Sequence, residues 1–179
     1  RAAEPLLFQL LATYPGHRLL LTCMTATGRA AALERFAGQA AVRVVWLPYD
    51  YPFAVRRFLN TFQPAIGLIM ETEIWPNLLQ ACRARRLPVL LVNARLSARS
   101  ARRYQWLQGL MRPAMQAFSA VSAQSAADAQ RLQTLGAALV EVGGNLKFEM
   151  QENLLAAPIA ARLRQYIGAR PVFLAASTR

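Results

Sequence analysis

The stretch AIGLIMETEIWPNLL, residues 65–79, joins an apolar run to a helix-like segment and places two carboxylates at the junction. The apolar run predicts a strand buried on both faces, as parallel sheets show. The WPN sequence then opens a helix, because proline is tolerated in the first turn, where no amide donor is needed. Ligands bind at such strand-to-helix corners in open α/β sheets, so Glu71 and Glu73 are candidate site residues.

Strand-like and helix-like patterns alternate along the rest of the chain, which predicts a parallel sheet flanked by helices. The first expected strand begins at Arg18, and the others span 42–48, 65–71, 88–94, 119–123 and about 139–144. Expected helices span 2–14, 27–37, a segment after Pro52, 75–86, a long stretch from about 97 to 118, and 125–135. Residues 1–150 therefore predict one α/β domain. Residues 151–157 resemble a linker, and a short helix at 158–168 and a strand at 171–179 predict the start of a second domain.

The composition predicts an anionic partner. Twenty-one basic residues against nine acidic ones give a net charge of +12, which favours nucleic acid, phosphorylated lipid or a membrane surface without choosing among them. Every basic residue except Lys147 is arginine. That single lysine is either a chance survivor of a GC-rich coding background or a site that requires a compact ammonium group.

Several classes of protein are disfavoured by what the sequence lacks. No run reaches the roughly 18–20 apolar residues of a membrane-spanning helix, and no signal peptide opens the chain. The chain begins at Arg1, so an N-terminal anchor stays an open question. Cys23 and Cys82 are far apart, which excludes a CxxC motif and predicts two reduced core thiols, as in a cytosolic protein.

Common catalytic and phosphate-binding motifs are also missing. The sequence contains neither GxGxxG nor GxxxxGK[ST], and its one histidine, His17, lies in a YPGH turn. A single histidine without a cysteine pair supplies no metal-ligand set and no hydrolase triad. We therefore expect no bound metal and no cofactor.

Two groups of charged side chains, the glutamates at 71 and 73 and the arginines from 95 to 102, each allow two interpretations. Glu71 and Glu73 stand at i and i+2 of an extended end, so both can point to one side of the strand. The alternative is that one of them caps the helix that starts near Trp75. Arg95, Arg99 and Arg102 are spaced to share one helical face, as either a solvated basic surface or a phosphate-binding ridge.

Seven segments together resemble one known family. They are TATG (25–28), LPYDYPFAVRRFL (47–59), METEIWPNLL (70–79), LVNARLSARSARRY (91–104), AQSAADAQRL (123–132), GGNLKFE (143–149) and AASTR (175–179). In this order they are similar to the 3-deoxy-D-manno-octulosonic acid (Kdo) transferases of lipid A synthesis. The resemblance implies a two-domain GT-B glycosyltransferase that moves Kdo from CMP-Kdo to the lipid A precursor, lipid IVA. It also implies a place on the cytoplasmic face of the bacterial inner membrane, and it implies no nucleic-acid partner.

The resemblance also implies roles for individual residues. Glu73 and Lys147 match transition-state stabilisers, whereas the family's general-base glutamate would fall just upstream of Arg1. On this basis residues 1–150 are the Rossmann-like acceptor-side domain without its first strand and catalytic loop. Residues 151–179 are then the linker and the truncated start of the nucleotide-sugar domain. Ser177, Thr178 and Arg179 match a corner where a donor phosphate contact is expected. We expect this chain alone to be inactive.

Two other hypotheses stay open at this stage. The first is a non-catalytic basic α/β module that binds anionic membrane or nucleic acid through its arginines, with strongly salt-dependent affinity. The second is a GT-B transferase that uses a different nucleotide sugar, which donor competition would distinguish.

Overall fold

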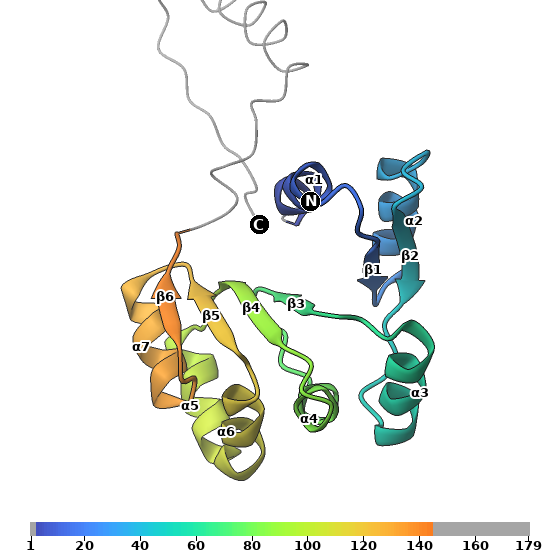
Figure 1. Ribbon diagram of the computed structural model, residues 1–179. Helices are drawn as coiled ribbons and strands as arrows, with labels where there is room; N and C mark the ends of the chain where they lie inside the picture. Colours follow the sequence, from blue (N-terminus) through green and yellow to red (C-terminus); the bar gives the residue numbers. More distant parts are fainter. Residues whose placement is uncertain (1–2, 145–179) are drawn as a thin grey trace, which may run out of the picture. The chain divides into compact units, whose positions relative to one another are not determined.

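The computed structural model describes residues 3–144, all of which belong to one compact unit. Its strands form two parallel sheets (Figure 1). The first pairs β1 (Leu19–Cys23) with β2 (Val42–Trp46). The second has the order β3 (Gly67–Met70), β4 (Val89–Ala94), β5 (Ala120–Ala123) and β6 (Val140–Val142). The prediction of an α/β fold with parallel strands is confirmed.

Seven helices are described, of which α1 precedes β1 and the other six lie between successive strands. They are α1 (Glu4–Thr13), α2 (Ala26–Arg35), α3 (Pro52–Phe62), α4 (Pro76–Ala84), α5 (Ala98–Trp106), α6 (Gln108–Gln116) and α7 (Ala126–Thr134). Three of them, α2, α5 and α7, begin after Thr25, Ser97 and Ser125, whose side-chain oxygens accept a hydrogen bond from the amide three residues on. The helix expected to open at the WPN sequence begins there, at Pro76.

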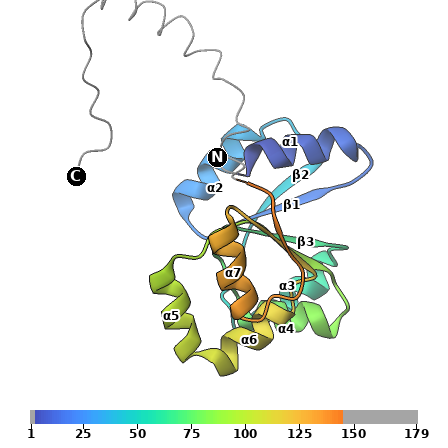
Figure 2. The ribbon, with the colours of Figure 1, turned by 90° about the vertical axis from the view of Figure 1, so that its left-hand side faces the viewer.

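One expected helix is divided into two. The segment predicted as a single helical stretch from about 97 to 118 breaks at Leu107, where α5 ends and α6 begins, and Figure 2 shows the two helices meeting at an angle. The expectation that Arg95 shares a helical face with Arg99 and Arg102 is wrong, because Arg95 precedes α5. The cap at Ser97 explains this start, because a residue that caps a helix has extended backbone angles and the helix begins after it.

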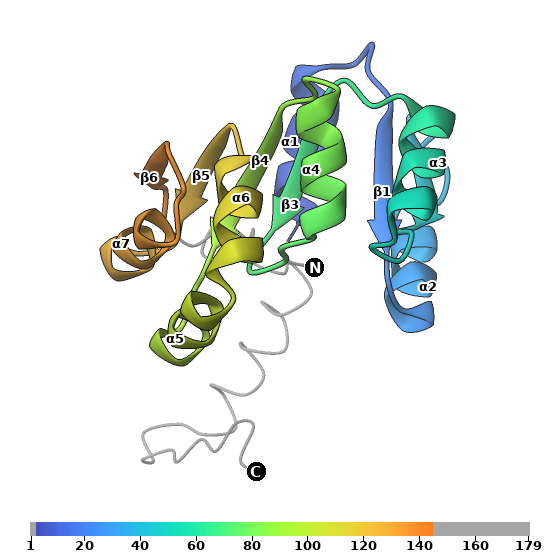
Figure 3. The same ribbon diagram turned by 90° about the horizontal axis from the view of Figure 1, so that it is seen from below.

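The hydrophobic core lies between the four-stranded sheet and the helices α4, α6 and α7, which cover one of its faces (Figures 1 and 3). Strand β4 shows this directly, since Val89, Leu91 and Asn93 are buried while Leu90 and Val92 are partly exposed. Successive side chains of a strand point to opposite faces. One face of the sheet is therefore tightly packed and the other only partly covered by described residues.

The prediction that residues 65–71 form a strand buried on both faces is wrong. Ile66 is 51% exposed and Leu68 is 37% exposed. Leu68 pairs in register with Leu90, so it lies on the sheet face that the described residues cover only in part, and β3 is also an edge strand. An apolar run predicts burial on both faces only where other elements cover both faces of the sheet.

The elements before α3 stand apart from this core. Of the described residues before Val55, only Phe36 is buried, and the leucines on the expected apolar face of α1 are only partly buried. Helix α1 contacts α2 through the rings of Phe8 and Phe36, whose centroids are 5.5 Å apart, and through an ion pair between Glu4 and Arg35. Strand β1, like β3, has one edge without a described strand partner.

Some sequence-based expectations concern residues outside 3–144. These are Lys147, the linker at 151–157, the helix at 158–168, the strand at 171–179 with Ser177, Thr178 and Arg179, and the domain boundary near residue 150.

Candidate functional site

The carboxyl ends of β3 and β4 carry two residues with left-handed backbone angles. Glu71 follows β3 with φ of 62°, and Asn93, which is 1% exposed, lies in β4 with φ of 54°. Such angles cost a non-glycine residue about 1–3 kcal/mol and occur preferentially at functional sites. The amide of Glu71 still donates to the carbonyl of Val92 over 3.0 Å, so the bend follows directly on the sheet ladder. A turn in backbone direction at Glu71 ends the alternation that would have put Glu71 and Glu73 on one side.

One hydrogen bond joins the two candidate segments. The hydroxyl of Thr72 donates to the carbonyl oxygen of Arg95 over 2.7 Å. Next to Thr72, the exposed Glu73 accepts a hydrogen bond through Oε2 from the indole Nε1 of Trp75 at 3.2 Å. The loop that carries Glu73 therefore adjoins the loop that carries Arg95, at the carboxyl ends of β3 and β4. The Glu73 side chain is oriented by its bond to Trp75.

The loop between β4 and α5 is fixed by a buried carboxylate. Asp128, 7% exposed, accepts a hydrogen bond from the amide of Leu96 at 2.9 Å and another from the hydroxyl of Ser125. Arg131 donates to the carbonyl of Leu96 over 3.1 Å and lies 3.6 Å from the Asp128 carboxylate. The backbone of Arg95 is thus held from the side of β3 and from the side of α7, whereas its side chain is exposed.

A third segment supplies the cap of α4. Asp50, in the loop after β2, accepts hydrogen bonds from the amides of Asn77 at 3.0 Å and Leu78 at 2.8 Å. Its carbonyl accepts a further bond from the Asn77 side-chain amide at 2.6 Å. The alternative that Glu73 caps this helix is therefore not what the structure shows, since Glu73 bonds Trp75 instead. This cap places the loop after β2 against the helix start that follows Glu73.

Exposed aromatic rings surround Asp50 in sequence. Tyr49, Tyr51 and Phe53 are 73%, 60% and 74% exposed. The rings of Tyr51 and Phe53 are stacked, with centroids 5.9 Å apart and planes inclined by 10°. Because Asp50 binds the start of α4, this aromatic loop adjoins the segment that carries Glu73 and Trp75. Flat, solvent-facing rings of this kind suit contact with sugar rings or acyl chains.

Three of these positioning residues were not predicted from the sequence. Asp50 and Thr72 bond partners that are 27 and 23 residues away, so no local spacing points to them. Asp128 could have been predicted as a helix-capping residue, because SAAD at 125–128 has the serine and acid three residues apart, as in a capping box.

The two thiols occupy different environments. Cys82 is buried in the core, and its burial raises the pKa of the thiol, with the nearby Arg85 opposing part of this rise. Cys23 is only partly buried, and burial raises the pKa of its thiol too, against the opposing charge of Arg29. Both thiols are free, and the prediction that both lie in the core holds for Cys82 alone.

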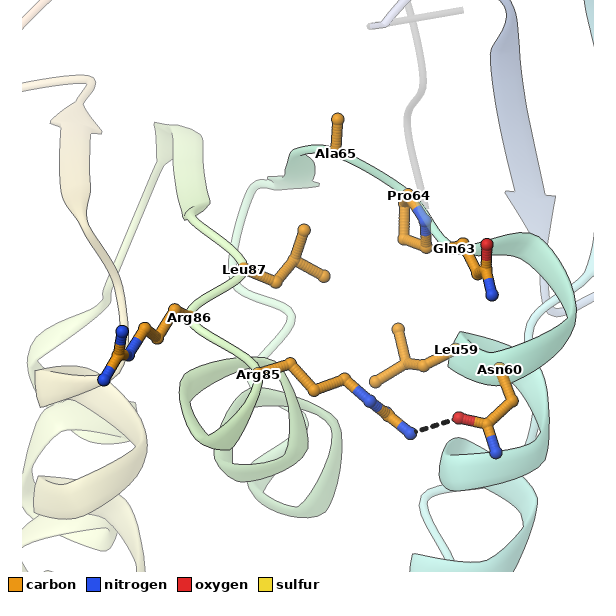
Figure 4. Close-up of a pocket in the computed structure, with 8 residues that line it drawn as sticks. All are labelled: Leu59, Asn60, Gln63, Pro64, Ala65, Arg85, Arg86 and Leu87. Carbon is orange, nitrogen blue, oxygen red and sulfur yellow. Dashed lines mark hydrogen bonds between the residues drawn. The ribbon is translucent and has the colours of Figure 1, made fainter.

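A cavity of about 360 Å³ lies elsewhere, where α3 and α4 end and the chain leads into β3 and β4 (Figure 4). Its lining residues are Leu59, Asn60, Gln63, Pro64, Ala65, Arg85, Arg86 and Leu87. The Arg85 guanidinium donates to Asn60 Oδ1 at 2.5 Å, and Arg86 points away from the hollow. Since ligands of α/β sheets bind at the carboxyl ends of the strands, this cavity at the amino ends is not the candidate site.

Residues 3–144 contain no group of three or more histidine, cysteine or acidic side chains placed to hold a metal ion. Within the same range, no helix has both the length and the apolar character needed to cross a bilayer.

The domain is of the α/β class, and its polar and charged side chains lie at the carboxyl ends of parallel strands, where domains of this class bind ligands. Residues 1–150 match the family model described as 3-Deoxy-D-manno-octulosonic-acid transferase (kdotransferase). The chain belongs to this family.

Individual relatives agree with the family match. The 3-deoxy-D-manno-octulosonic acid transferase of Bordetella pertussis is 45% identical over 187 residues, which cover 100% of this chain and 42% of that protein. The Haemophilus influenzae protein of the same name is 36% identical over 180 residues, covering 99% of this chain and 42% of that protein. A bifunctional glycosyltransferase/methyltransferase of Fusobacterium nucleatum is 32% identical over 90% of this chain and 26% of its own length. The chain thus spans about two fifths of the length of the first two relatives.

We expect Asp128→Ala to lower the free energy of unfolding by about 1.5–3 kcal/mol, because the Leu96 amide loses a charged acceptor. Urea unfolding of the chain measures this. Glu34→Ala, which removes an exposed acid and changes the net charge equally, is the control and should stay within about 0.5 kcal/mol of the parent. Equal stabilities for the two variants would contradict the anchoring role of Asp128.

Proposed function

We propose that the complete protein transfers Kdo from CMP-Kdo to the phosphorylated lipid A precursor, lipid IVA, at the cytoplasmic face of the inner membrane. Family membership supports the reaction, and the sequence resemblance supports the choice of donor and acceptor. In this proposal residues 1–150 form the acceptor-side domain, and the residues that follow begin the nucleotide-sugar domain.

The observation that carries the proposal is the Thr72–Arg95 hydrogen bond. It brings the loop with Glu73 beside the loop with Arg95, at the edge of the sheet where α/β proteins bind ligands. Arginine forks bind phosphate and carboxylate groups, and both substrates carry such groups. Arg95 is therefore the arginine that we assign to substrate binding, because its backbone is fixed while its guanidinium faces solvent.

The reaction forms a bond between an acceptor hydroxyl oxygen and the anomeric carbon of Kdo, and it breaks the bond from that carbon to the CMP phosphate. A general base takes the hydroxyl proton, and CMP leaves with the electron pair. We assign the ammonium group of Lys147 to the negative charge that develops on the departing phosphate or the donor carboxylate. We assign Glu73 to holding the donor or the neighbouring base, and Ser177, Thr178 and Arg179 to the donor phosphate.

The free edges of β1 and β3 support one more element of this proposal. We propose that a strand preceding α1 in the complete protein pairs with both edges and joins the two sheets. Helix α1 leads into β1 as a crossover helix does, and a strand before it would lie parallel to β1. Its carboxyl end would then meet the edge that carries Glu73, where the family resemblance expects the general-base glutamate.

In the complete protein, Glu73→Ala and Lys147→Ala should each lower kcat for Kdo transfer about 10²–10³-fold, because each removes a group that acts in the transition state. Transfer from CMP-Kdo to lipid IVA is the assay, and Glu34→Ala is the control for the loss of one acid. The 179-residue chain alone should give no turnover. Normal transfer by either variant, or acceptance of another nucleotide sugar in place of CMP-Kdo, would contradict the assignment.

Arg95→Ala in the complete protein should raise KM for the acceptor or the donor about tenfold, since a charge-assisted contact to the substrate is lost. The matched control is Arg83→Ala, which removes an exposed arginine late in α4. An unchanged KM for both substrates would show that the Arg95 side chain serves no substrate.

If a strand fills the slot beside β1 and β3, the amides of Leu20, Thr22 and Leu68 should exchange more slowly in the complete protein than in the 179-residue chain. These amides alternate with those that already donate to β2 and β4, so they point to the free edges, and a paired amide is protected. Hydrogen exchange followed by mass spectrometry measures this. The amides of β5, which has partners on both sides already, are the internal control. Equal exchange of β1 and β3 in both proteins would rule the added strand out.

A further inference from the structure

Trp106 is the most exposed large hydrophobic side chain among residues 3–144. It is 91% exposed, whereas the next most exposed, Phe53, is 74% exposed. Tryptophan buries more apolar surface than most residues do and is usually well covered in a folded domain. A ring this open to solvent, at the last residue of α5, indicates a surface with a contact of its own.

Two leucines extend the apolar surface at the turn between α5 and α6. Leu107, at the junction of the helices, is 52% exposed, and Leu110, in the first turn of α6, is 55% exposed. We call Trp106, Leu107 and Leu110 the α5–α6 corner. Figure 2 shows the angle at which the two helices meet there. The core contacts of this region come from other residues, such as Ala101 and Met111, which are buried.

Basic side chains flank the corner. Arg99, Arg102 and Arg103 precede Trp106 by seven, four and three residues, so they share its face of α5, and all three are exposed. No aspartate or glutamate occurs anywhere between Glu73 and Asp128. An apolar tip beside several arginines and no acid matches an anionic, partly apolar partner in both charge and polarity.

We propose that the α5–α6 corner is the part of this domain that enters the headgroup region of an anionic lipid bilayer. Trp106 and the two leucines would lie at the boundary between headgroups and acyl chains, where aromatic and aliphatic residues of interfacial helices bind. The arginines keep their guanidinium groups at the lipid phosphates while their apolar stems cover the corner.

The observations favour a bilayer over nucleic acid. Single-stranded nucleic acid can stack on a tryptophan and pair with arginines. It has no apolar surface to cover Leu107 and Leu110, whereas the bilayer interface covers all three corner residues. The inference deepens the proposed function, which needs a lipid acceptor, but lipid binding by the corner can be measured without any transfer reaction.

The test uses the complete protein and vesicles of phosphatidylcholine mixed with an equal amount of phosphatidylglycerol. Brominated lipids should quench the tryptophan fluorescence of the parent protein and of Trp46→Phe, and this quenching should fall sharply in Trp106→Phe. Trp46 is the matched control because it is half-exposed and lies beside Arg29 rather than at the corner. The conservative phenylalanine keeps an aromatic ring, which limits any effect on folding.

Co-sedimentation with the same vesicles gives the affinity. The double variant Trp106→Ala with Leu110→Ala should bind about tenfold more weakly, and binding should weaken as salt is added. Transfer to acceptor dispersed in detergent should be unchanged in this variant, which separates the corner from the catalytic site. Quenching that is equal in Trp106→Phe and the parent, equal binding to purely neutral vesicles, or displacement of vesicles by single-stranded nucleic acid would overturn the proposal. If transfer were absent altogether, the vesicle result would still stand on its own.

Discussion

The carboxylate of Asp128 is the interaction on which the candidate site depends. It is nearly buried and holds the Leu96 amide, and thereby the loop that carries Arg95. An amide and a carboxylate at this depth would each cost free energy if unpaired, so the loop has one favourable position. Thr72 then bonds that loop from the side of β3. The result is an edge whose backbone is fixed while its charged side chains face solvent.

Asp50 fixes the backbone of a neighbouring segment, the start of α4, in the way that Asp128 fixes the loop with Arg95. The chain has two aspartates, and both accept hydrogen bonds from backbone amides of other segments. The start of α4 lies next to Glu73 and Trp75, and the sequence neighbours of Asp50, Tyr49 and Tyr51, are exposed. Short polar side chains that bond the backbone thus position the longer side chains of the site. Such an arrangement keeps the backbone of the candidate site in place while its longer side chains face solvent.

The sequence pattern predicts the order of strands and helices well because β3, β4 and β5 are short apolar runs, each followed by a capped or proline-led helix. It predicts the burial of β3 badly, since an apolar run does not show which face of the sheet stays only partly covered. The acid at residue 73 could be found as a corner residue, but its partner Trp75 and the real cap of α4 could not. The Glu73–Trp75 bond is local but depends on side-chain rotamers, and the cap by Asp50 depends on which distant loops meet. A pattern of residues along the chain contains neither kind of information.

We propose that Glu73, Arg95 and Lys147 all serve one ligand. The most direct measurement is an experimental structure of the complete protein with CMP and the acceptor bound. We expect all three side chains to lie within hydrogen-bond distance of these ligands or of a group that contacts them. A structure in which the ligands lie away from the carboxyl ends of β3 and β4, with the Glu73 and Lys147 side chains on opposite faces, would contradict it.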